Sequence, residues 1–387
     1  MGRVPSTIFF KWNDYISNPK YYISTMNFSD TDERFMRRAL ELARGAKGAT
    51  FPNPAVGAVI VSAGGQVVGE GATDAYGGPH AERRAIEAAG DAARGAAMYV
   101  TLEPCPHFGR TPPCVDGIIE AGIAKVIAAV EDPNPLVAGN GLRRLRESGI
   151  ETASGLLARE AESVNEDFFW AIVRKRPWVA LKLAMTLDGR VADSLGGSKW
   201  ITSPEARREV QEIRRRHGAI AVGKNTLLLD DPKLTARCDK TFYPARIVFS
   251  SDSNIPQDRY FSTHAGEARS IVVVRGGERG IDRGGQIEIW RTGVVDNAES
   301  INVFLDMAYA EGLNSILVEG GQRLASVFLE NGFVNKLYIF YGNKIFGGGM
   351  SGLDFSSGLP VDNCLRLDGV IHKSFGVDFM VSGYAKK

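Results

Sequence analysis

Apolar residues recur along this chain of 387 residues at two spacings, one typical of helices and one typical of strands. Segment 29–46, SDTDERFMRRALELARGA, has the helical spacing, and we expect Asp30 to cap this helix, with Glu33 three residues later and Gly45 at its end. Segment 55–71, AVGAVIVSAGGQVVGEG, predicts two strands joined at Gly64-Gly65, which is a hairpin signal.

Short strands and helices alternate through the rest of the chain. The predicted strands cover residues 96–102, 125–130, 178–185, 219–223, 245–250, 270–275, 287–290, 315–320 and 336–342. The predicted helices cover residues 80–90, 114–123, 141–150, 204–216, 298–311 and 323–331. This alternation predicts α/β domains whose sheets are covered by helices on both faces. The pattern changes at Lys175–Pro177, where we place the boundary between two domains.

Composition limits the class of protein. Apolar residues make up 44% of the chain and charged residues 24%, which is ordinary for a globular protein of two or three domains. The net charge of +1 gives no overall attraction to nucleic acid, and no apolar run approaches the roughly 18 to 20 residues of a membrane span. Four cysteines are too few for a disulfide framework, which indicates a reducing, cytoplasmic compartment. Residues 1–26 lack the features of a signal peptide and are interpreted as a leader of unknown role.

Four residues carry the chemistry of a metal site. His80 and Glu82, in GGPHAE, are followed by Cys105, which comes after a proline, and by Cys114. Zinc deaminases carry H-x-E followed by Pro-Cys and a second Cys. Imidazole and thiolates are typical zinc ligands, and three protein ligands leave a fourth position for a water that the ion acidifies. His80, Cys105 and Cys114 are therefore candidate ligands, and Glu82 is the candidate base that moves the proton.

Simpler interpretations exist for each of these residues. A lone His-x-Glu is common, and two cysteines separated by eight residues can be buried thiols or part of a structural zinc site with His107 as the fourth ligand. A structural site, however, has no use for a carboxylate beside His80. Because residues two apart on a helix do not share a face, we expect His80 in the turn before a helix and Cys114 at a helix start. The order of the four residues favours a catalytic site.

Longer motifs identify the first half of the chain more specifically. PNPAVGAVIV, GGPHAE, YVTLEPCPHFGRTPPC and DPNPLVAGNG resemble the deaminase half of the bifunctional pyrimidine deaminase–reductases of the riboflavin pathway, a family with a long loop between its zinc cysteines. The resemblance implies a three-layer αβα cytidine-deaminase-like domain that uses Zn²⁺ to deaminate 2,5-diamino-6-ribosylamino-4(3H)-pyrimidinone 5′-phosphate. Asn53 is a candidate contact of the pyrimidine ring or a turn residue between two prolines. His107 and Arg110 are candidate phosphate contacts or solvated loop residues.

The second half resembles the reductase half of the same family in LKLAMTLDGR, SKWIT, EIRRRHGAIAVGKNTLLLDDPKLTAR and ILVEGG. The resemblance implies a dihydrofolate-reductase-like α/β domain that uses NADPH to reduce the ribosyl group to a ribityl chain. It implies substrate contacts from Ser198, Arg214, Leu234, Arg237 and Glu319. It implies cofactor contacts from Ala184, Trp200, Thr226, Asp230, Ser251, Gly321, Gln322, Arg323 and Leu324.

Lys182 and Glu319 are the pair that we expect to perform the polar chemistry of this reduction. Opening a cyclic aminal to an imine requires a proton to move, and a lysine with a carboxylate can move it and meet the developing charge. The alternative is a salt bridge between two strand ends. Gly320 and Gly321, before a predicted helix, would let backbone N–H groups approach a phosphate.

The sequence thus predicts a bifunctional enzyme of riboflavin biosynthesis, with a deaminase domain at 27–174 and a reductase domain at 177–387. Its expected partners are small pyrimidine ribosylamino phosphates, with neither nucleic acid nor membrane, and the resemblance implies a homo-oligomer, a dimer or higher. The alternatives are a deaminase whose second half only scaffolds, a structural zinc protein, and a nucleic-acid base deaminase, which would need a basic groove with stacking aromatic residues.

Overall fold

The structure is a computed structural model, and it describes residues 28–109, 111–135 and 137–386. The chain forms two compact units, which divide between Phe169 and Trp170 inside helix α7 (Glu166–Arg174). We call them unit 1 and unit 2 in chain order. Both are α/β units, as the sequence predicts. The expected leader at 1–26 lies outside the described residues.

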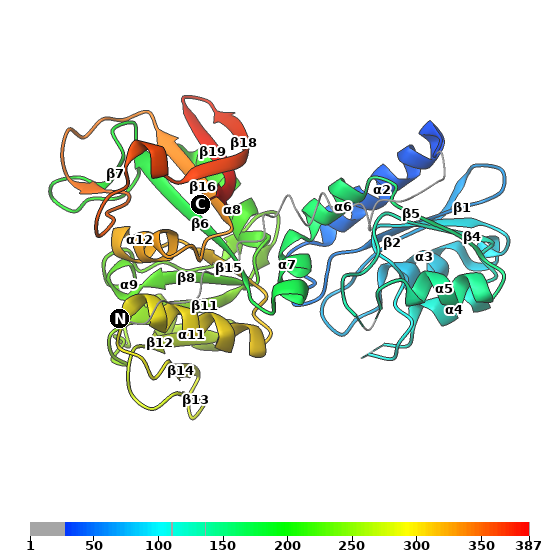
Figure 1. The fold of residues 1–387 in the computed structure, drawn as a ribbon, viewed down its shortest axis with the longest axis horizontal. Coiled ribbons are helices and arrows are strands. Elements are labelled where there is room, and N and C mark those ends of the chain that lie inside the picture. The colour runs from blue at the N-terminus through cyan, green and yellow to red at the C-terminus, as the bar shows by residue number, and fades with distance from the viewer. Residues whose placement is uncertain (1–27, 110, 136, 387) are drawn as a thin grey trace. The chain divides into compact units, whose positions relative to one another are not determined.

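Unit 1 is built on a five-stranded mixed sheet with the order β2-β1-β3-β4-β5 (Figure 1). The strands are β1 (Gly57–Val61), β2 (Val67–Ala72), β3 (Ala97–Val100), β4 (Lys125–Ala128) and β5 (Glu151–Ser154). β1 runs antiparallel to β2 and β3, whereas β3, β4 and β5 are parallel. The predicted hairpin at Gly64-Gly65 is therefore confirmed. All residues of β1 are buried, so this strand is covered on both faces of the sheet.

Helices pack against this sheet and supply half of its core. The described helices of unit 1 are α2 (Asp30–Ala46), α3 (Ala81–Ala89), α4 (Cys114–Glu120), α5 (Asn140–Glu147), α6 (Ala158–Val164) and the start of α7. Met36, Leu40 and Ile118 bury their side chains in one core with the strands. α3 lies close against β2, because a Cβ at Gly71 would meet the backbone oxygen of Ala81 at 2.3 Å. This close approach fixes the start of α3 relative to the sheet.

The cap of α2 differs from the prediction. Ser29, not Asp30, is the N-cap: its hydroxyl accepts from the backbone N–H of Asp32 at 3.2 Å, and the Asp32 carboxylate accepts from the N–H of Ser29 at 2.9 Å. The two bonds form a capping box, which needs serine and its partner three residues apart. The prediction of Asp30 was wrong because the reciprocal partner of Ser29 is Asp32. The helix ends at Ala46, one residue beyond Gly45.

Unit 2 is built on a ten-stranded sheet with the order β13-β14-β12-β11-β8-β15-β6-β16-β19-β18. The strands are β6 (Trp178–Thr186), β8 (Ala219–Gly223), β11 (Ala245–Ser250), β12 (Ser270–Val274), β13 (Gly280–Asp282), β14 (Ile287–Arg291), β15 (Ser315–Val318), β16 (Lys336–Gly342), β18 (Arg366–Phe375) and β19 (Asp378–Lys386). The strands from β14 to β16 are parallel, whereas β13, β19 and β18 pair antiparallel at the edges. Two short pairs stand apart, β7 (Arg190–Ala192) with β17 (Met350–Ser351) and β9 (Ala236–Arg237) with β10 (Thr241–Phe242).

Helices cover both faces of this sheet, as predicted. The described helices of unit 2 are the end of α7, α8 (Pro204–Arg215), α9 (Lys224–Asp230), α10 (Tyr260–Thr263), α11 (Asn297–Ala310) and α12 (Gln322–Glu330). Leu181 of β6 packs in one core with Phe304 of α11 and Phe328 of α12. The preceding residue, Ala180, packs in another core with Val210 of α8. None of the helices in the described ranges combines the length and the apolar character of a membrane span.

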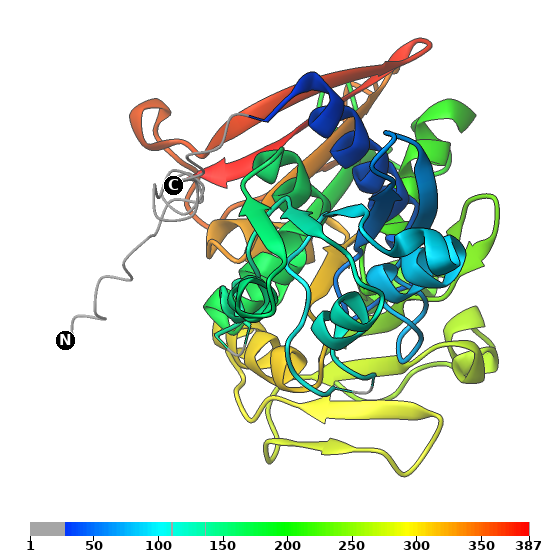
Figure 2. The same cartoon turned by 90° about the vertical axis from the view of Figure 1, so that its right-hand side faces the viewer.

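Two hairpins lie at opposite edges of unit 2. Figure 2 shows the β18–β19 hairpin (red) at one edge and the strands β13 and β14 (yellow) at the other. The sequence pattern does not predict β18, because this strand is exposed at most of its positions and therefore lacks the alternation of a half-buried strand.

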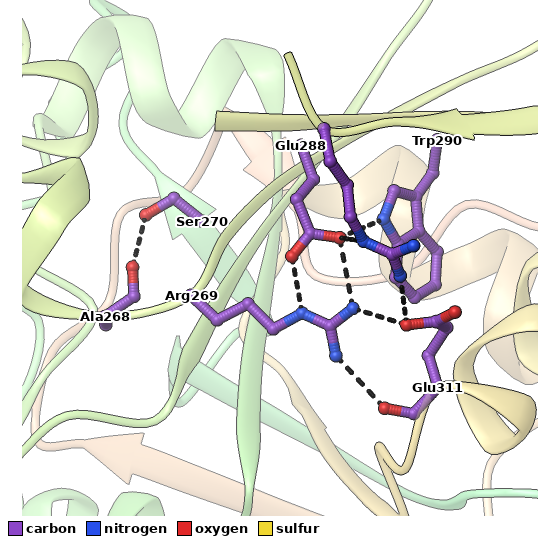
Figure 3. Close-up of polar contacts among 7 residues, drawn as sticks. Ala268, Arg269, Ser270, Glu288, Trp290 and Glu311 are labelled. Atoms are coloured by element: carbon purple, nitrogen blue, oxygen red, sulfur yellow. Dashed lines mark hydrogen bonds and ion pairs between the residues drawn. The ribbon is translucent and has the colours of Figure 1, made fainter. Parts of the chain in front are cut away.

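A network of charges ties β14 to the end of α11 (Figure 3). Arg269 donates to both carboxylate oxygens of Glu288, at 2.6 and 3.0 Å, and to the carboxylate of Glu311 at 2.7 Å. Arg283 pairs with the same two glutamates, and the indole N–H of Trp290 donates to Glu288 at 2.9 Å. Each of the two carboxylates is therefore paired with two positively charged arginines.

Candidate active sites

Two of the candidate zinc-site residues lie at the start of α3. His80 is the N-cap residue, with extended backbone angles, and Glu82 lies in the first helical turn, where it is only 4% exposed. The loop before them is closed by a hydrogen bond from the N–H of Asp74 to the carbonyl of Pro79, at 3.0 Å. His80 therefore lies before the helix, as predicted. Residues two apart within a helix point to different faces, and this restriction does not apply to His80 and Glu82 because His80 is not a helical residue.

The two cysteines meet although a long loop separates them. Cys105 lies in the loop after β3, and Cys114 is the first residue of α4, after Pro113. The N–H of Cys114 donates to Sγ of Cys105 at 3.5 Å, and the N–H of Val115 donates to the carbonyl of Cys105 at 3.3 Å. These bonds bring the start of α4 back onto the Cys105 segment.

The three predicted ligands converge on one point. Nδ1 of His80 lies 3.2 Å from Sγ of Cys114 and 3.7 Å from Sγ of Cys105. Ligands about 2.0 to 2.3 Å from a tetrahedral zinc ion are about 3.5 to 3.8 Å apart, so this donor set fits zinc. Within the described residues no fourth His, Cys, Asp or Glu joins the group, and His107 is exposed. The arrangement leaves one tetrahedral corner for water.

The surroundings change the acidity of these groups. Hydrogen bonds from Cys114 and His80 lower the pKa of Cys105, which favours the thiolate that binds a metal. Burial, together with the charge of Cys105, raises the pKa of Glu82 to about 7. A group that gives and takes protons near neutral pH needs a pKa in this range. On the other side of the imidazole, Nε2 of His80 lies 3.5 Å from Oγ1 of Thr111.

The structure does not test the other predicted contacts of unit 1. Asn53 lies in a turn between α2 and β1, where its backbone N–H donates to the carbonyl of Thr50 at 2.9 Å. Its contact with a pyrimidine ring stays a prediction. Arg110 lies outside the described residues.

One buried carboxylate beside the zinc residues, that of Glu103, was not among the residues predicted from the sequence. Glu103 is 3% exposed and accepts hydrogen bonds from the backbone N–H groups of Asp132, Gly139 and Leu142, at 3.2, 2.8 and 3.1 Å. The available signal was a charged residue directly after an apolar strand, next to Pro-Cys. The sequence does not name its partners, because they lie 29 to 39 residues farther along the chain.

Unit 2 contains a cavity of about 1260 Å³. It lies at the carboxyl ends of β6, β8, β11 and β15, the edge at which open α/β sheets bind ligands. Every residue that the reductase resemblance implies lines this one cavity: Lys182, Ala184, Ser198, Trp200, Arg214, Thr226, Asp230, Leu234, Arg237, Ser251, Glu319, Gly321, Gln322, Arg323 and Leu324. The structure thus brings together residues that are spread over more than a hundred positions of the sequence.

Glu319 pairs with Arg214. Its two oxygens accept from Nε and Nη2 of Arg214, at 2.7 Å each, and Nη1 of Arg214 donates to the carbonyl of Thr235 at 3.1 Å. Burial alone would raise the pKa of Glu319, but the charges of Arg214 and Lys182 lower it to about 2. The pKa of Lys182 is lowered by burial and by Arg214, whereas Glu319 acts in the opposite direction. Among the described residues, the ion-pair partner of Glu319 is therefore Arg214, and Lys182 is its electrostatic neighbour.

At the opening of the cavity, a predicted substrate residue is hydrogen-bonded to a predicted cofactor residue. Oγ of Ser198 donates to the carboxylate of Asp230 at 3.1 Å, and Nζ of Lys199 donates to the backbone carbonyl of Asp230 at 3.0 Å. The next residue, Trp200, is 61% exposed, and the guanidinium of Arg207 lies 4.4 Å from its ring centroid. A wide apolar ring therefore stands exposed where a ligand enters.

The cavity is strongly cationic. Ten lysines and arginines line it against three aspartates and glutamates, although the whole chain has a net charge of only +1. Such an enclosed excess of positive charge favours phosphorylated ligands. Six of these cations were not predicted as site residues, because in sequence a cation that faces a ligand looks the same as one that faces water. They are Lys199, Arg207, Arg208, Lys224, Lys233 and Arg275.

Two protein-family descriptions match the chain. Residues 29–130 match the cytidine and deoxycytidylate deaminase zinc-binding region, and residues 177–381 match the RibD C-terminal domain. Among curated proteins, the riboflavin biosynthesis protein RibD of Aquifex aeolicus is 42% identical over 328 residues, which covers 83% of this chain and 90% of that protein. The RibD protein of Escherichia coli is 40% identical over 349 residues, with coverage of 85% and 92%.

Solved structures agree with these matches. A diaminohydroxyphosphoribosylaminopyrimidine deaminase/5-amino-6-(5-phosphoribosylamino)uracil reductase of Thermotoga maritima is 38% identical, with a TM-score of 0.78 over 92% of this chain and 99% of that one. A RibD structure from Acinetobacter baumannii is 31% identical, with a TM-score of 0.80 and the same coverage. The expected fold classes, cytidine-deaminase-like and dihydrofolate-reductase-like, are confirmed. The chain therefore belongs to the RibD family, the bifunctional zinc-dependent deaminases and NADPH-dependent reductases of riboflavin biosynthesis.

Proposed function

We propose that residues 27–174 deaminate 2,5-diamino-6-ribosylamino-4(3H)-pyrimidinone 5′-phosphate at C2 and that residues 177–387 then reduce its ribosyl group to a ribityl chain. The observation that carries the proposal is the convergence of one imidazole nitrogen and two sulfurs beside the buried carboxylate of Glu82. The cationic cavity of unit 2 supports the second step, because both the substrate and NADPH carry phosphate groups.

The deaminase step depends on one proton carrier. Zinc, held by His80, Cys105 and Cys114, supplies the Lewis acidity that makes a water molecule nucleophilic. Glu82 takes a proton from the attacking water and delivers a proton to the departing amino group, so that ammonia leaves and a carbonyl remains. Asn53 orients the ring through its amide, which both donates and accepts hydrogen bonds.

The reductase step depends on the charges around Lys182. NADPH supplies the hydride that reaches C1′. Lys182 gives a proton to the ring oxygen as the aminal opens to a protonated imine, and hydride transfer to C1′ of this cation gives the amine, so that one proton is consumed in all. Glu319 keeps the pKa of Lys182 from falling further, because its carboxylate favours the ammonium form.

The two arginines of the substrate site have different tasks. Arg214 is committed to Glu319 and to the carbonyl of Thr235, so it orients Glu319. The guanidinium of Arg237 donates one hydrogen bond within the described residues, to the hydroxyl of Thr235 at 2.6 Å, and keeps its other N–H groups for the substrate phosphate. Ser198 and Leu234 complete this side of the site. The nine cofactor residues named from the resemblance hold NADPH along the strand ends.

One experiment separates this function from its rivals. Purified protein is analysed for zinc, for ammonia released from the diaminopyrimidinone phosphate, and for NADPH oxidation with the deaminated product. We expect one zinc per chain and both activities. Zinc without ammonia release would indicate a structural site, and ammonia release without NADPH oxidation would indicate that unit 2 only scaffolds. Release of ammonia from RNA or DNA instead would indicate a nucleic-acid deaminase.

We further propose a homodimer that forms in the cytoplasm. Among the residues that the structure describes, the ten-residue strand β18 forms an edge of the unit 2 sheet with no strand beyond it, and Val370 and Ile371 on it are 45% and 60% exposed. An unpaired strand edge with apolar side chains supports pairing with a second copy. All four cysteines are free, which supports a reducing compartment. Light scattering of wild type and of Ile371→Lys tests the dimer, because the lysine should yield monomers.

A further inference from the structure

Glu103 connects two segments of unit 1 that follow neighbouring strands. It lies three residues beyond the end of β3, and its backbone N–H donates to the carbonyl of Val130, after β4, at 3.0 Å. β3 and β4 are parallel, so their carboxyl ends lie at the same edge of the sheet. The zinc ligand Cys105 is two residues beyond Glu103. The β4–α5 connection (residues 129–135 and 137–139) therefore begins beside the zinc site.

The side chain of Glu103 binds this connection at several points. One oxygen accepts from the N–H groups of Asp132 and Gly139, and the other accepts from the N–H of Leu142 in the first turn of α5. The carboxylate is 3% exposed, and the described residues show no cation paired with it. Charge-assisted bonds of this kind are stronger than neutral ones, and a buried carboxylate that lost them would be costly.

The helix that follows touches the zinc-ligand segment directly. A Cβ on Gly141 would lie 2.0 Å from the backbone oxygen of Pro104 and 3.1 Å from the Glu103 carboxylate. Arg144, one turn later in α5, donates to the carbonyl of Pro106 at 3.2 Å. The start of α5 thus packs on both sides of Cys105, and Glu103 lies at the centre of this contact.

We propose that Glu103 is a positioning residue of the deaminase: it holds the β4–α5 connection against the zinc-ligand segment, so that the connection forms a fixed wall of the pyrimidine site. A wall that is already in place lowers the entropy lost when the substrate binds. Glu103 does not touch the zinc ligands through its side chain, so its effect falls on substrate binding and not on the metal. The inference rests on the proposed deaminase function of unit 1.

Glu103→Gln tests this role with little change in size. The amide oxygen still accepts hydrogen bonds, but the NH₂ group faces a backbone N–H that it cannot bind. We expect the KM for the diaminopyrimidinone phosphate to rise about tenfold or more, from the loss of charge-assisted bonds. We expect kcat, zinc content and the NADPH oxidation rate of unit 2 to stay within about twofold of wild type. Hydrogen exchange at Gly139 and Leu142 should become faster.

The matched control is Glu147→Gln, on the same helix. Glu147 is 59% exposed and pairs with Arg143 at 2.8 Å, so its loss should leave KM unchanged. Gly141→Ala is a second test, because the added Cβ meets both the backbone oxygen of Pro104 and the Glu103 carboxylate and so moves α5 away from them. It should raise KM in the same way.

Three outcomes would overturn the proposal. The first is an unchanged KM and unchanged hydrogen exchange in Glu103→Gln. The second is a loss of zinc with a fall in kcat at constant KM, which would mean that Glu103 supports Cys105 itself. If Glu103→Gln does not fold, the third is an unchanged KM in Gly141→Ala. A wild-type protein without zinc or ammonia release would instead refute the proposed function, so the two failures are distinguishable.

Discussion

Arg214 holds both carboxylate oxygens of Glu319 at 2.7 Å, whereas Lys182, on the strand next to that of Glu319, makes no ion pair within 4 Å in the described part of the chain. The carboxylate is therefore shared unequally between two buried cations. Arg214 makes the direct hydrogen bonds to Glu319, whereas Lys182 interacts with the Arg214–Glu319 pair only electrostatically. This division leaves the ammonium of Lys182 available to a substrate in the cavity.

Glu319→Gln should abolish most of the reductase activity. The substitution leaves Arg214 buried without its counter-charge and removes the charge that favours the protonated form of Lys182. We expect kcat/KM for NADPH-dependent reduction to fall about a hundredfold or more, because Lys182 loses the charge that favours its proton-donating form and a general acid contributes about 10² to 10⁴-fold to a rate. Ammonia release by unit 1 serves as the internal control, and a reductase rate near wild type would contradict the proposed role.

The same residue makes the stability of unit 2 depend on pH. The pKa of Glu319 is lowered from 4.5 to about 2, so its ionised form stabilises the fold above about pH 4.5. This contribution is lost as the pH falls from about 4.5 to about 2, because the folded state must then bind the proton at an unfavourable site. Urea unfolding of unit 2 at several pH values should show this loss in wild type and a shallower dependence in Glu319→Gln. Equal pH dependence in the two proteins would refute the assignment.

Glu82→Gln should separate zinc binding from catalysis. The amide preserves the size of the side chain but cannot take a proton from water. We expect deamination to fall by about 10² to 10⁴-fold, the usual contribution of a general acid–base group, with zinc content unchanged. Elemental analysis and ammonia release provide the two measurements, and substantial activity in this variant would exclude Glu82 as the proton carrier.

Removing the metal should abolish the deaminase activity of unit 1 and leave the reductase activity of unit 2 intact. Cys105→Ser weakens the soft donor set that His80 and Cys114 complete, and a chelator should have the same effect on wild type. We expect zinc and ammonia release to be lost together, while NADPH oxidation with the deaminated substrate continues. Added Zn²⁺ should restore the chelated wild type and should restore Cys105→Ser poorly. Parallel loss of both activities would mean that the metal supports the whole chain.

Arg269 should stabilise unit 2 without a catalytic role. Replacing it with Met leaves Arg283 as the one arginine of this network that pairs with Glu288 and Glu311. Because Arg283 remains and Arg269 is 30% exposed, we expect a loss of only about 2 kcal/mol in the free energy of unfolding. Arg143→Met is the control, because both partners of its ion pair are exposed and its loss should cost less than about 0.5 kcal/mol. Urea titration measures both, and equal effects would argue against the network.

The zinc constellation could be predicted from sequence because its signals are local. His80 follows Pro79 and directly precedes a helix, and Cys114 follows Pro112-Pro113, so the short-range pattern already places both at helix starts. The chemistry of imidazole and thiolate then names the metal. The same locality explains why the elements that were predicted lie within about three residues of the observed ones, whereas elements with weaker local signals, such as α6, α9 and β5, were not predicted.

The rest depends on long-range packing, which a single sequence does not show. From the sequence we pair Glu319 with Lys182 and assign Arg214 to the substrate. The ion pair of Glu319 with Arg214 depends on which side chain reaches the carboxylate in the folded chain. Glu103 finds its partners in a loop and a helix that come much later in the chain. Strand β18 was missed because its partner, β19, fixes it through backbone bonds while its side chains face outward.

The cavity of unit 2 concentrates more positive charge than the whole molecule carries, so the remainder of the chain is net acidic. A phosphorylated ligand in this cavity therefore meets cations that the formal charge of the chain conceals. Net charge alone does not reveal such a site, because it averages over regions of opposite sign.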